Sequence, residues 1–133
     1  PFELKTEEAR AALPKTYSRE DAVYNLSRSG LMTASLFSGE LQNLRVAVQD
    51  RIHQPYRSGL IDHYDDVFRM SYELGSLGTY VSGAGPTIIA MIDAENAQAF
   101  GKNCVTHLED KGIMGWRVEI LSAAPQGAQI VIE

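Results

Sequence analysis

A few side chains of this 133-residue chain have the types and spacing needed to bind a small anionic molecule. Arg10 follows Thr6 by four residues, so one helical turn brings both to the same side of a short helix. Arg57 stands in "HQPYR" (53–57), and "SGAGP" (82–86) carries two glycines. Guanidinium groups form planar, bidentate pairs with carboxylates and phosphates, so two arginines brought together by the fold would suit such a ligand. In isolation the same arginines would be ordinary solvated surface residues.

The glycine-rich stretch "YVSGAGPTII" (80–89) has two interpretations. It contains the first half of G-x-G-x-x-G, but Ile88 stands where the third glycine would fall, and a strand-like run follows instead of a helix. No Gly-Lys-Ser/Thr follows either, so a Walker A loop is excluded. What remains is a plain turn between strands, or a turn whose bare N–H groups bind an anion. In either case Gly83 and Gly85 are expected to tolerate no side chain.

The other reactive residue types predict no catalytic residue and no metal site. Cys104 falls on the apolar stripe of a helix and is expected in the core. The aspartates between 62 and 66 favour a helix start through the helix dipole. None of the histidines has the spacing of a metal ligand pair: His53, His63 and His107.

Length and composition predict one compact domain over residues 1–133. The net charge of −5 is spread without basic clusters, which argues against nucleic acid or an anionic membrane as partner. One cysteine excludes an internal disulfide, and no run approaches the roughly 20 apolar residues of a membrane span, so a cytoplasmic location is expected. The opening "PFEL" (1–4) suggests a domain cut from a longer protein.

Local start and stop signals divide the first half into helices. Thr6 and Ser18 are expected N-caps, and Gly39 should end the long second helix, whose apolar second half predicts a central position. Pro55 forbids a helix continuing through it, and the polar and aromatic residues around it mark a functional or strained segment.

From residue 78 the pattern becomes that of strands, interrupted by one further helix. The order predicts an α+β, ferredoxin-like domain with an antiparallel or mixed sheet of about four strands and helices on one face. The expected helices cover 4–14, 18–39, 40–50, 62–75 and 94–112, and the expected strands cover 78–83, 86–93, 116–121 and 127–133.

Taken together, "TEEARAALP", "QDRIHQPYRSGLI" and "GSLGTYVSGAGPTIIAMID" resemble, in order and spacing, the C-terminal half of the bacterial homoserine kinases, a family of GHMP small-molecule kinases. The resemblance implies transfer of the γ-phosphoryl group of ATP to the hydroxyl of L-homoserine, on the way to threonine. It implies that Thr6 and Arg10 line the amino-acid site and that Arg57 holds the substrate carboxylate. It also implies that Gly83, with Ser82, Ala84 and Gly85, forms a loop beside substrate and phosphates.

The family's ATP loop and its Mg²⁺-binding acid belong to an N-terminal half that this sequence does not contain. ATP and Mg²⁺ are therefore expected to bind mainly outside this chain, and the isolated chain is expected to lack kinase activity. The resemblance also allows a homodimer. Two alternatives remain: an amino-acid-sensing module like the ACT domains, which are usually shorter and begin with a strand, and another GHMP kinase such as a mevalonate kinase.

Overall fold

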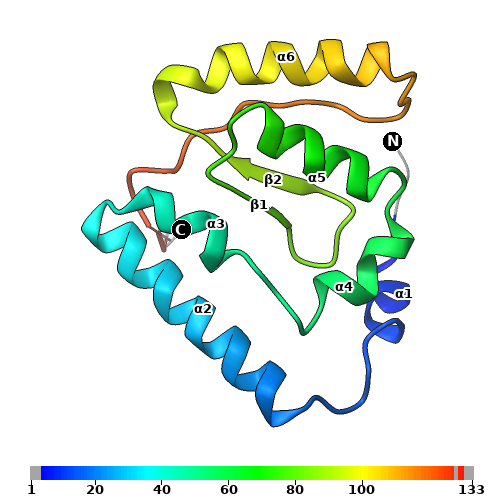
Figure 1. Ribbon diagram of the computed structural model, residues 1–133, viewed down its shortest axis with the longest axis vertical. Helices are drawn as coiled ribbons and strands as arrows, with labels where there is room; N and C mark the ends of the chain where they lie inside the picture. The colour runs from blue at the N-terminus through cyan, green and yellow to red at the C-terminus, as the bar shows by residue number, and fades with distance from the viewer. Residues whose placement is uncertain (1–3, 128, 131–133) are drawn as a thin grey trace.

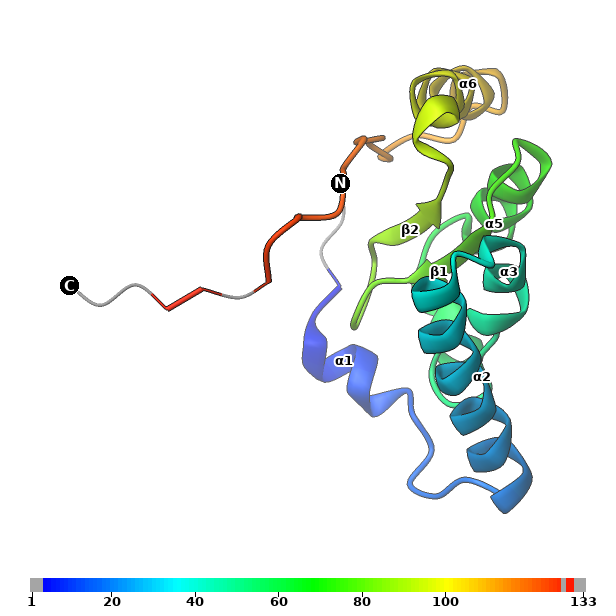
Figure 2. The same ribbon diagram turned by 90° about the vertical axis from the view of Figure 1, so that its left-hand side faces the viewer.

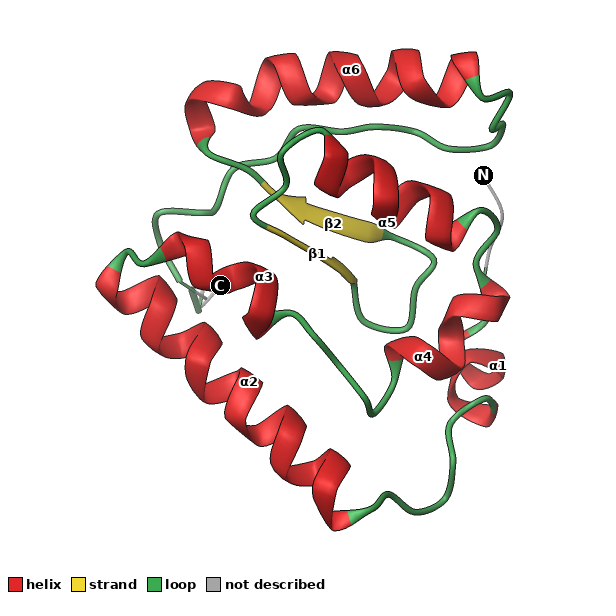
Figure 3. Ribbon diagram, viewed as in Figure 1, coloured by secondary structure: helices red, strands yellow, loops and turns green. Residues whose placement is uncertain are grey.

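Helices surround one short β-hairpin in the computed structural model, which describes residues 4–127, 129 and 130. Figures 1 and 3 show the hairpin at the centre, with α6 along one side and α2 along another. In chain order the elements are α1 (Thr6–Ala11), α2 (Arg19–Ser38), η1 (Leu41–Asn43), α3 (Leu44–Ala47), α4 (Gln54–Arg57), η2 (Ser58–Leu60), α5 (Tyr64–Glu73), β1 (Gly78–Val81), β2 (Ile88–Met91), η3 (Ala94–Asn96) and α6 (Ala97–Asp110), where η marks a 3₁₀ helix.

The sheet consists of β1 and β2, which pair antiparallel with Gly78 opposite Met91 and Val81 opposite Ile88. The expected hairpin is therefore present. The expectation of about four strands is wrong, because the described part of the chain contains two. The predicted strand 127–133 lies largely outside the described residues.

The segment 116–121, expected as a strand, keeps the alternation of a strand without its hydrogen-bond ladder. Trp116 and Val118 are half-buried against the core, whereas Arg117 is exposed. Further along, Ile120 lies on α6, where its Cδ1 atom would come within 2.9 Å of a Cβ atom at Gly101. Side-chain packing on the helix, not backbone pairing, thus accounts for the alternating pattern of this segment.

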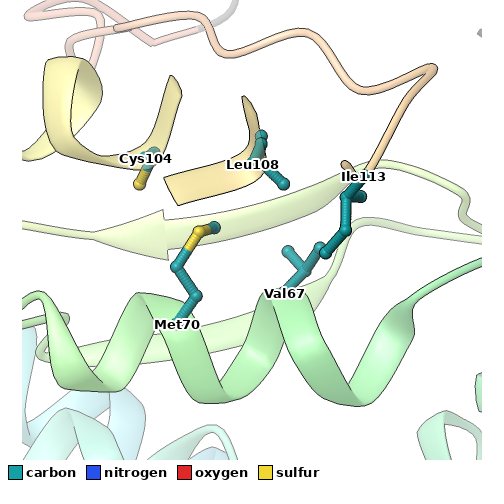
Figure 4. Close-up of a cluster of buried hydrophobic side chains, with 5 residues drawn as sticks. All are labelled: Val67, Met70, Cys104, Leu108 and Ile113. Atoms are coloured by element: carbon teal, nitrogen blue, oxygen red, sulfur yellow. The ribbon is translucent and has the colours of Figure 1, made fainter. Parts of the chain in front are cut away.

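The main core lies between α5 and α6. Figure 4 shows Val67 and Met70 of α5 pointing toward Cys104 and Leu108 of α6, with Ile113 closing one end. Cys104 thus lies in the core, as its place on an apolar helical stripe predicts. Val105 of the same helix does not join this core, since it is 42% exposed.

Helix α2 begins and ends as its sequence predicts. The Ser18 hydroxyl accepts a hydrogen bond from the backbone N–H of Asp21 (3.0 Å), and Gly39 ends the helix with a φ of +78°. The prediction that this helix is central is wrong, since Leu26 is 73% exposed and Phe37 is 90% exposed. Figure 2 shows α2, α3 and α5 on the same side of the hairpin, with the C-terminal segment leaving on the opposite side. No helix in the described ranges is both long and apolar enough to cross a membrane.

Candidate functional site

Arg57, the last residue of α4, connects α1 to the loop between β1 and β2. Its side chain is buried, with 8% of its surface exposed. Its Nε donates to the carbonyl oxygen of Ala9 in α1 (3.2 Å), and its Nη1 donates to the carbonyl oxygen of Gly83 (2.8 Å). The Nη1 atom also lies 3.4 Å from Nδ1 of His53. One guanidinium thus draws together segments that are 48 and 26 residues away in the chain.

The positive charge of Arg57 is not balanced by any acidic side chain in the described ranges. None of the ion pairs found there involves Arg57, and its Nη2 atom makes no hydrogen bond there. Carbonyl oxygens supply dipoles, not a negative charge. The Nη2 atom is not among the buried donors left without a partner, so it reaches solvent and can donate to a carboxylate or phosphate.

The loop from residue 82 to 87 is a tight turn closed by its own backbone. The N–H of Ser82 donates to the carbonyl oxygen of Thr87 (2.8 Å), and the N–H of Gly85 donates to that of Ser82 (3.0 Å). Gly83, at the first central position of the turn, has a φ of +57°, as in type II′ hairpin turns. The N–H groups of Gly83 and Ala84 donate no hydrogen bond to any described residue and remain free to meet an anion.

The two glycines of this loop are constrained in different ways. Gly85 has a φ of +88°, and a Cβ atom there would lie 3.2 Å from Ile61 Cδ1 and 3.4 Å from Leu4 Cδ2. A Cβ atom at Gly83 would meet nothing within 4 Å. Both glycines are therefore required by backbone conformation, and Gly85 is also required by the apolar packing beneath the loop.

Thr6 and Arg10 lie on α1, the helix that Arg57 contacts through Ala9. Both side chains are exposed, whereas Ala9 is fully buried. Thr6 is the first residue of α1 and not its N-cap, a position that Lys5 occupies without a side-chain hydrogen bond. The structure thus attaches the predicted site helix to the glycine loop through Arg57, and it leaves Arg10 exposed.

Asp50, which the sequence analysis did not single out, fixes the start of α4. Its carboxylate accepts hydrogen bonds from the backbone N–H groups of Ile52 (3.1 Å), His53 (2.8 Å) and Gln54, and from the side-chain amide of Asn25. Burial alone would raise the pKa of Asp50, but these hydrogen bonds outweigh it and lower the pKa below its ordinary 3.8. An aspartate ahead of a proline-containing turn is the sequence signal that could have indicated this cap.

Gln54 lies in the segment around Pro55 that the sequence marks as functional or strained, but its bonding partners were not predicted. It is 7% exposed, its Nε2 donates to the carbonyl oxygen of Val48 (3.1 Å), and its Oε1 accepts from the N–H of Val81 (2.8 Å). No sequence signal indicates these partners. The neighbouring Pro55 does not prevent a helix here, because it lies in the first turn of α4, where no intrahelical N–H donor is needed.

His53 lies between Asp50 and Arg57 and is half-buried. Its Nε2 atom is 3.9 Å from the Asp50 carboxylate. Burial lowers the pKa of His53 below its ordinary 6.5 and Arg57 lowers it further, against the opposing effect of Asp50. The neutral ring that results at pH 7 can accept a hydrogen bond from Arg57 through Nδ1.

Neither the cysteine nor a cluster of metal ligands is found at this site among the described residues. Burial raises the pKa of Cys104 to about 11, so the thiol stays protonated and belongs to the core. Across residues 4–127, 129 and 130, no three His, Cys, Asp or Glu residues are grouped so that they could hold a metal ion.

Two hollows lie outside the corner formed by α1, α4 and the glycine loop. One, of about 430 Å³, is mostly apolar and lies between β2, α6 and residues 115–121. The other, of about 620 Å³, is lined by aromatic side chains of α2 and α5. Asp50 and Gln54 also line it. Arg57 lines neither.

Comparison with known proteins places the chain in a family. Residues 31–108 match the family model described as GHMP kinases C terminal. The chain is 47% identical to a homoserine kinase of Clostridium botulinum and 48% identical to one of Clostridium beijerinckii, each over 130 residues that make up 98% of this chain and 43% of the relative. The crystal structure of homoserine kinase from Cytophaga hutchinsonii superposes with a TM-score of 0.75 at 32% identity, over 83% of this chain and 35% of that one. The chain thus spans less than half the length of these relatives.

Proposed function

The chain belongs to the GHMP kinases, in which it matches the C-terminal domain, and from this premise we propose that it supplies the substrate-binding C-terminal part of a homoserine kinase. The reaction is ATP-dependent phosphorylation of the L-homoserine hydroxyl to O-phospho-L-homoserine. The observation that carries the proposal is Arg57, a buried guanidinium without an acidic partner in the described ranges, held between α1 and the glycine loop.

The proposed roles follow from the chemistry of each group. Arg57 binds the homoserine carboxylate through its free Nη2 donor, because charge-assisted hydrogen bonds to a guanidinium are short and strong. Arg10 and Thr6, exposed on α1, complete the amino-acid site. The free N–H groups of Gly83 and Ala84 lie in a loop without bulky side chains and stabilise negative charge on the phosphoryl group.

Phosphoryl transfer requires little covalent chemistry from these residues. The homoserine hydroxyl oxygen bonds to the γ-phosphorus, the bond from that phosphorus to the ADP oxygen breaks, and the hydroxyl proton passes to water. Catalysis of such a step is mostly positioning and charge stabilisation, so no acid or base is assigned here. The described residues do not fit Mg²⁺, since no cluster of ligands exists among them, and ATP with its Mg²⁺ is expected to be held mainly by residues outside this chain.

Another GHMP kinase remains the alternative in the same class, because the glycine loop alone does not choose the acceptor. Homoserine is favoured because the relatives named above are homoserine kinases that align over 98% of the chain. A sensing module of the ACT type is disfavoured by the helices that precede the hairpin and by the family match.

The assignment is tested in a homoserine kinase that carries this chain as its C-terminal part. Arg57→Ala should raise the KM for homoserine about thirtyfold or more, because loss of a charge-assisted contact costs roughly 2–5 kcal/mol, and the KM for ATP should change much less. Arg69→Ala, an exposed arginine paired with Asp66, is the matched control and should leave both values unchanged. Phosphorylation of mevalonate in preference to homoserine by the wild-type enzyme would reject the homoserine assignment.

A further inference from the structure

In the described part of the chain, side chains and not a third strand close the outer edge of β1. Ser82 and Thr87 form a hydrogen-bonded pair, so the alternation of an antiparallel ladder directs the N–H groups of Thr79 and Val81 away from β2. The Tyr72 hydroxyl accepts from Thr79 (3.1 Å), and the amide oxygen of Gln54 accepts from Val81 (2.8 Å). Of these two contacts, the one to Val81 lies directly before the glycine loop.

The side chain of Gln54 uses both ends of its amide. Its oxygen holds the N–H of Val81, and its nitrogen holds the carbonyl oxygen of Val48, just beyond α3. At 7% exposure it cannot exchange these partners freely for water. Only a group with a donor and an acceptor at this spacing satisfies both, so the bridge is specific to an amide.

The short helix α4 holds the polypeptide on both sides of Ser82. Gln54 at its start bonds the backbone of Val81, and Arg57 at its end bonds the carbonyl oxygen of Gly83. Asp50 holds the start of α4 through three backbone N–H groups. The position of the glycine loop therefore depends on a single helical turn whose own ends are fixed.

We propose that Gln54 is a positioning residue that sets the conformation of the glycine loop. It touches neither substrate nor phosphate. By fixing the N–H of Val81, it holds the free N–H groups of Gly83 and Ala84 in one arrangement relative to Arg57. The kinetic consequence of this proposal rests on the proposed function, whereas the conformational consequence concerns this chain alone.

The conformational test is amide hydrogen exchange followed by NMR on the 133-residue chain. Gln54→Met should speed exchange of the Val81 amide about tenfold relative to that of Leu108 in α6, because one buried hydrogen bond is lost locally. Gln54→Glu keeps an acceptor for Val81 but loses the donor to the Val48 carbonyl oxygen, so it should restore only part of the protection of the Val81 amide. Gln42→Met, at an exposed glutamine bonded only to Glu40, should change neither amide. Equal acceleration at Val81 and Leu108, or no acceleration, would overturn the proposal.

The kinetic test uses the kinase that carries this chain. Gln54→Met should lower kcat about tenfold, with KM for homoserine changed less than about threefold, because misplaced N–H groups lose charge stabilisation mainly in the transition state. Gln54→Glu, which keeps only the acceptor, should recover part of kcat, and Gln42→Met should have no effect. An unchanged kcat alongside faster Val81 exchange would overturn the positioning role. If the wild-type kinase does not phosphorylate homoserine, the proposed function fails, and the exchange result still decides whether Gln54 fixes the loop.

Discussion

At the glycine loop, the chain is held by buried polar side chains that bond the backbone of distant segments, whereas between α5 and α6 it is held by apolar contact. Arg57 and Gln54 each satisfy two backbone groups of other segments, and Asp50 satisfies three backbone N–H groups of the turn that follows it. In the apolar core, Met70 and Cys104 form no hydrogen bond with each other and are held by van der Waals packing. The first arrangement fixes positions within tenths of an ångström, and the second tolerates adjustment at some cost in stability. Binding of a small zwitterion requires the first.

The largest expected effect is a loss of stability caused by a substitution in the apolar core. Leu108→Ala should lower the free energy of unfolding by about 2–5 kcal/mol, because a buried side chain is replaced by a cavity, as measured by urea denaturation. Val105→Ala on the same helix, where the side chain is 42% exposed, should cost much less. Similar losses of stability at both positions would mean that the α5–α6 contact is not the core.

The next effect separates the two glycines of the loop. Gly83→Ala should cost about 1–2 kcal/mol, since a side chain at positive φ is strained. Gly85→Ala should cost more, because its methyl group also meets Ile61 at 3.2 Å. Thermal unfolding of the two variants measures the difference. A costlier Gly83→Ala would show that packing beneath Gly85 does not constrain the loop.

A smaller effect concerns the cap on α4. Asp50→Asn should lower the free energy of unfolding by about 1–2 kcal/mol at pH 7. In the wild type, the backbone N–H groups bond both carboxylate oxygens, whereas the amide of the variant has one acceptor oxygen. Since the folded pKa of Asp50 is lowered, its contribution is present above pH 3.8 and is lost as the pH falls through the folded pKa.

The variant should therefore lose less stability than the wild type between pH 5 and pH 2, as followed by urea titrations at each pH. Asp93→Asn, at an exposed aspartate ahead of η3, is the matched control and should keep the wild-type acid response. An unaltered acid response in Asp50→Asn would contradict the cap.

The smallest expected effect is a pH dependence from His53. Its folded pKa is lowered, so the unfolded chain binds the proton more readily, and stability should fall as the pH drops below 6.5. His53→Gln should remove this slope between pH 7 and pH 5, whereas His63→Gln, at an exposed histidine, should retain it. A slope that persists without His53 would assign the effect to another group.

Features with local signals could be predicted from the sequence, and features that depend on distant partners could not. The Ser18 cap, the Gly39 stop and the hairpin around the glycine loop are confirmed, because each depends on residues within one turn. The expected four-stranded sheet was wrong, since alternation in 116–121 reflects packing on α6 and not pairing with β2.

The candidate site shows the same limit. Arg57 could be chosen from the sequence as an anion-binding residue, but its partners, the carbonyl oxygens of Ala9 and Gly83, are brought to it only by the fold. Gln54 bonds a residue 27 positions away, and nothing in its neighbours indicates that contact. The binding roles of Thr6, Arg10, Arg57 and the loop around Gly83 stay predictions.

The exposed stripe on α2 has a practical consequence for work with this chain. Phe37 and Leu26 present apolar surface to water, and salts such as sulfate strengthen the association of such surfaces. Self-association of the chain should therefore increase with protein concentration and with the concentration of such salts. Dilute protein at low ionic strength is the favourable condition for NMR. Phe37, at the end of α2 and in neither of the hydrophobic clusters, is the position where one charged residue would improve handling with little cost to the fold.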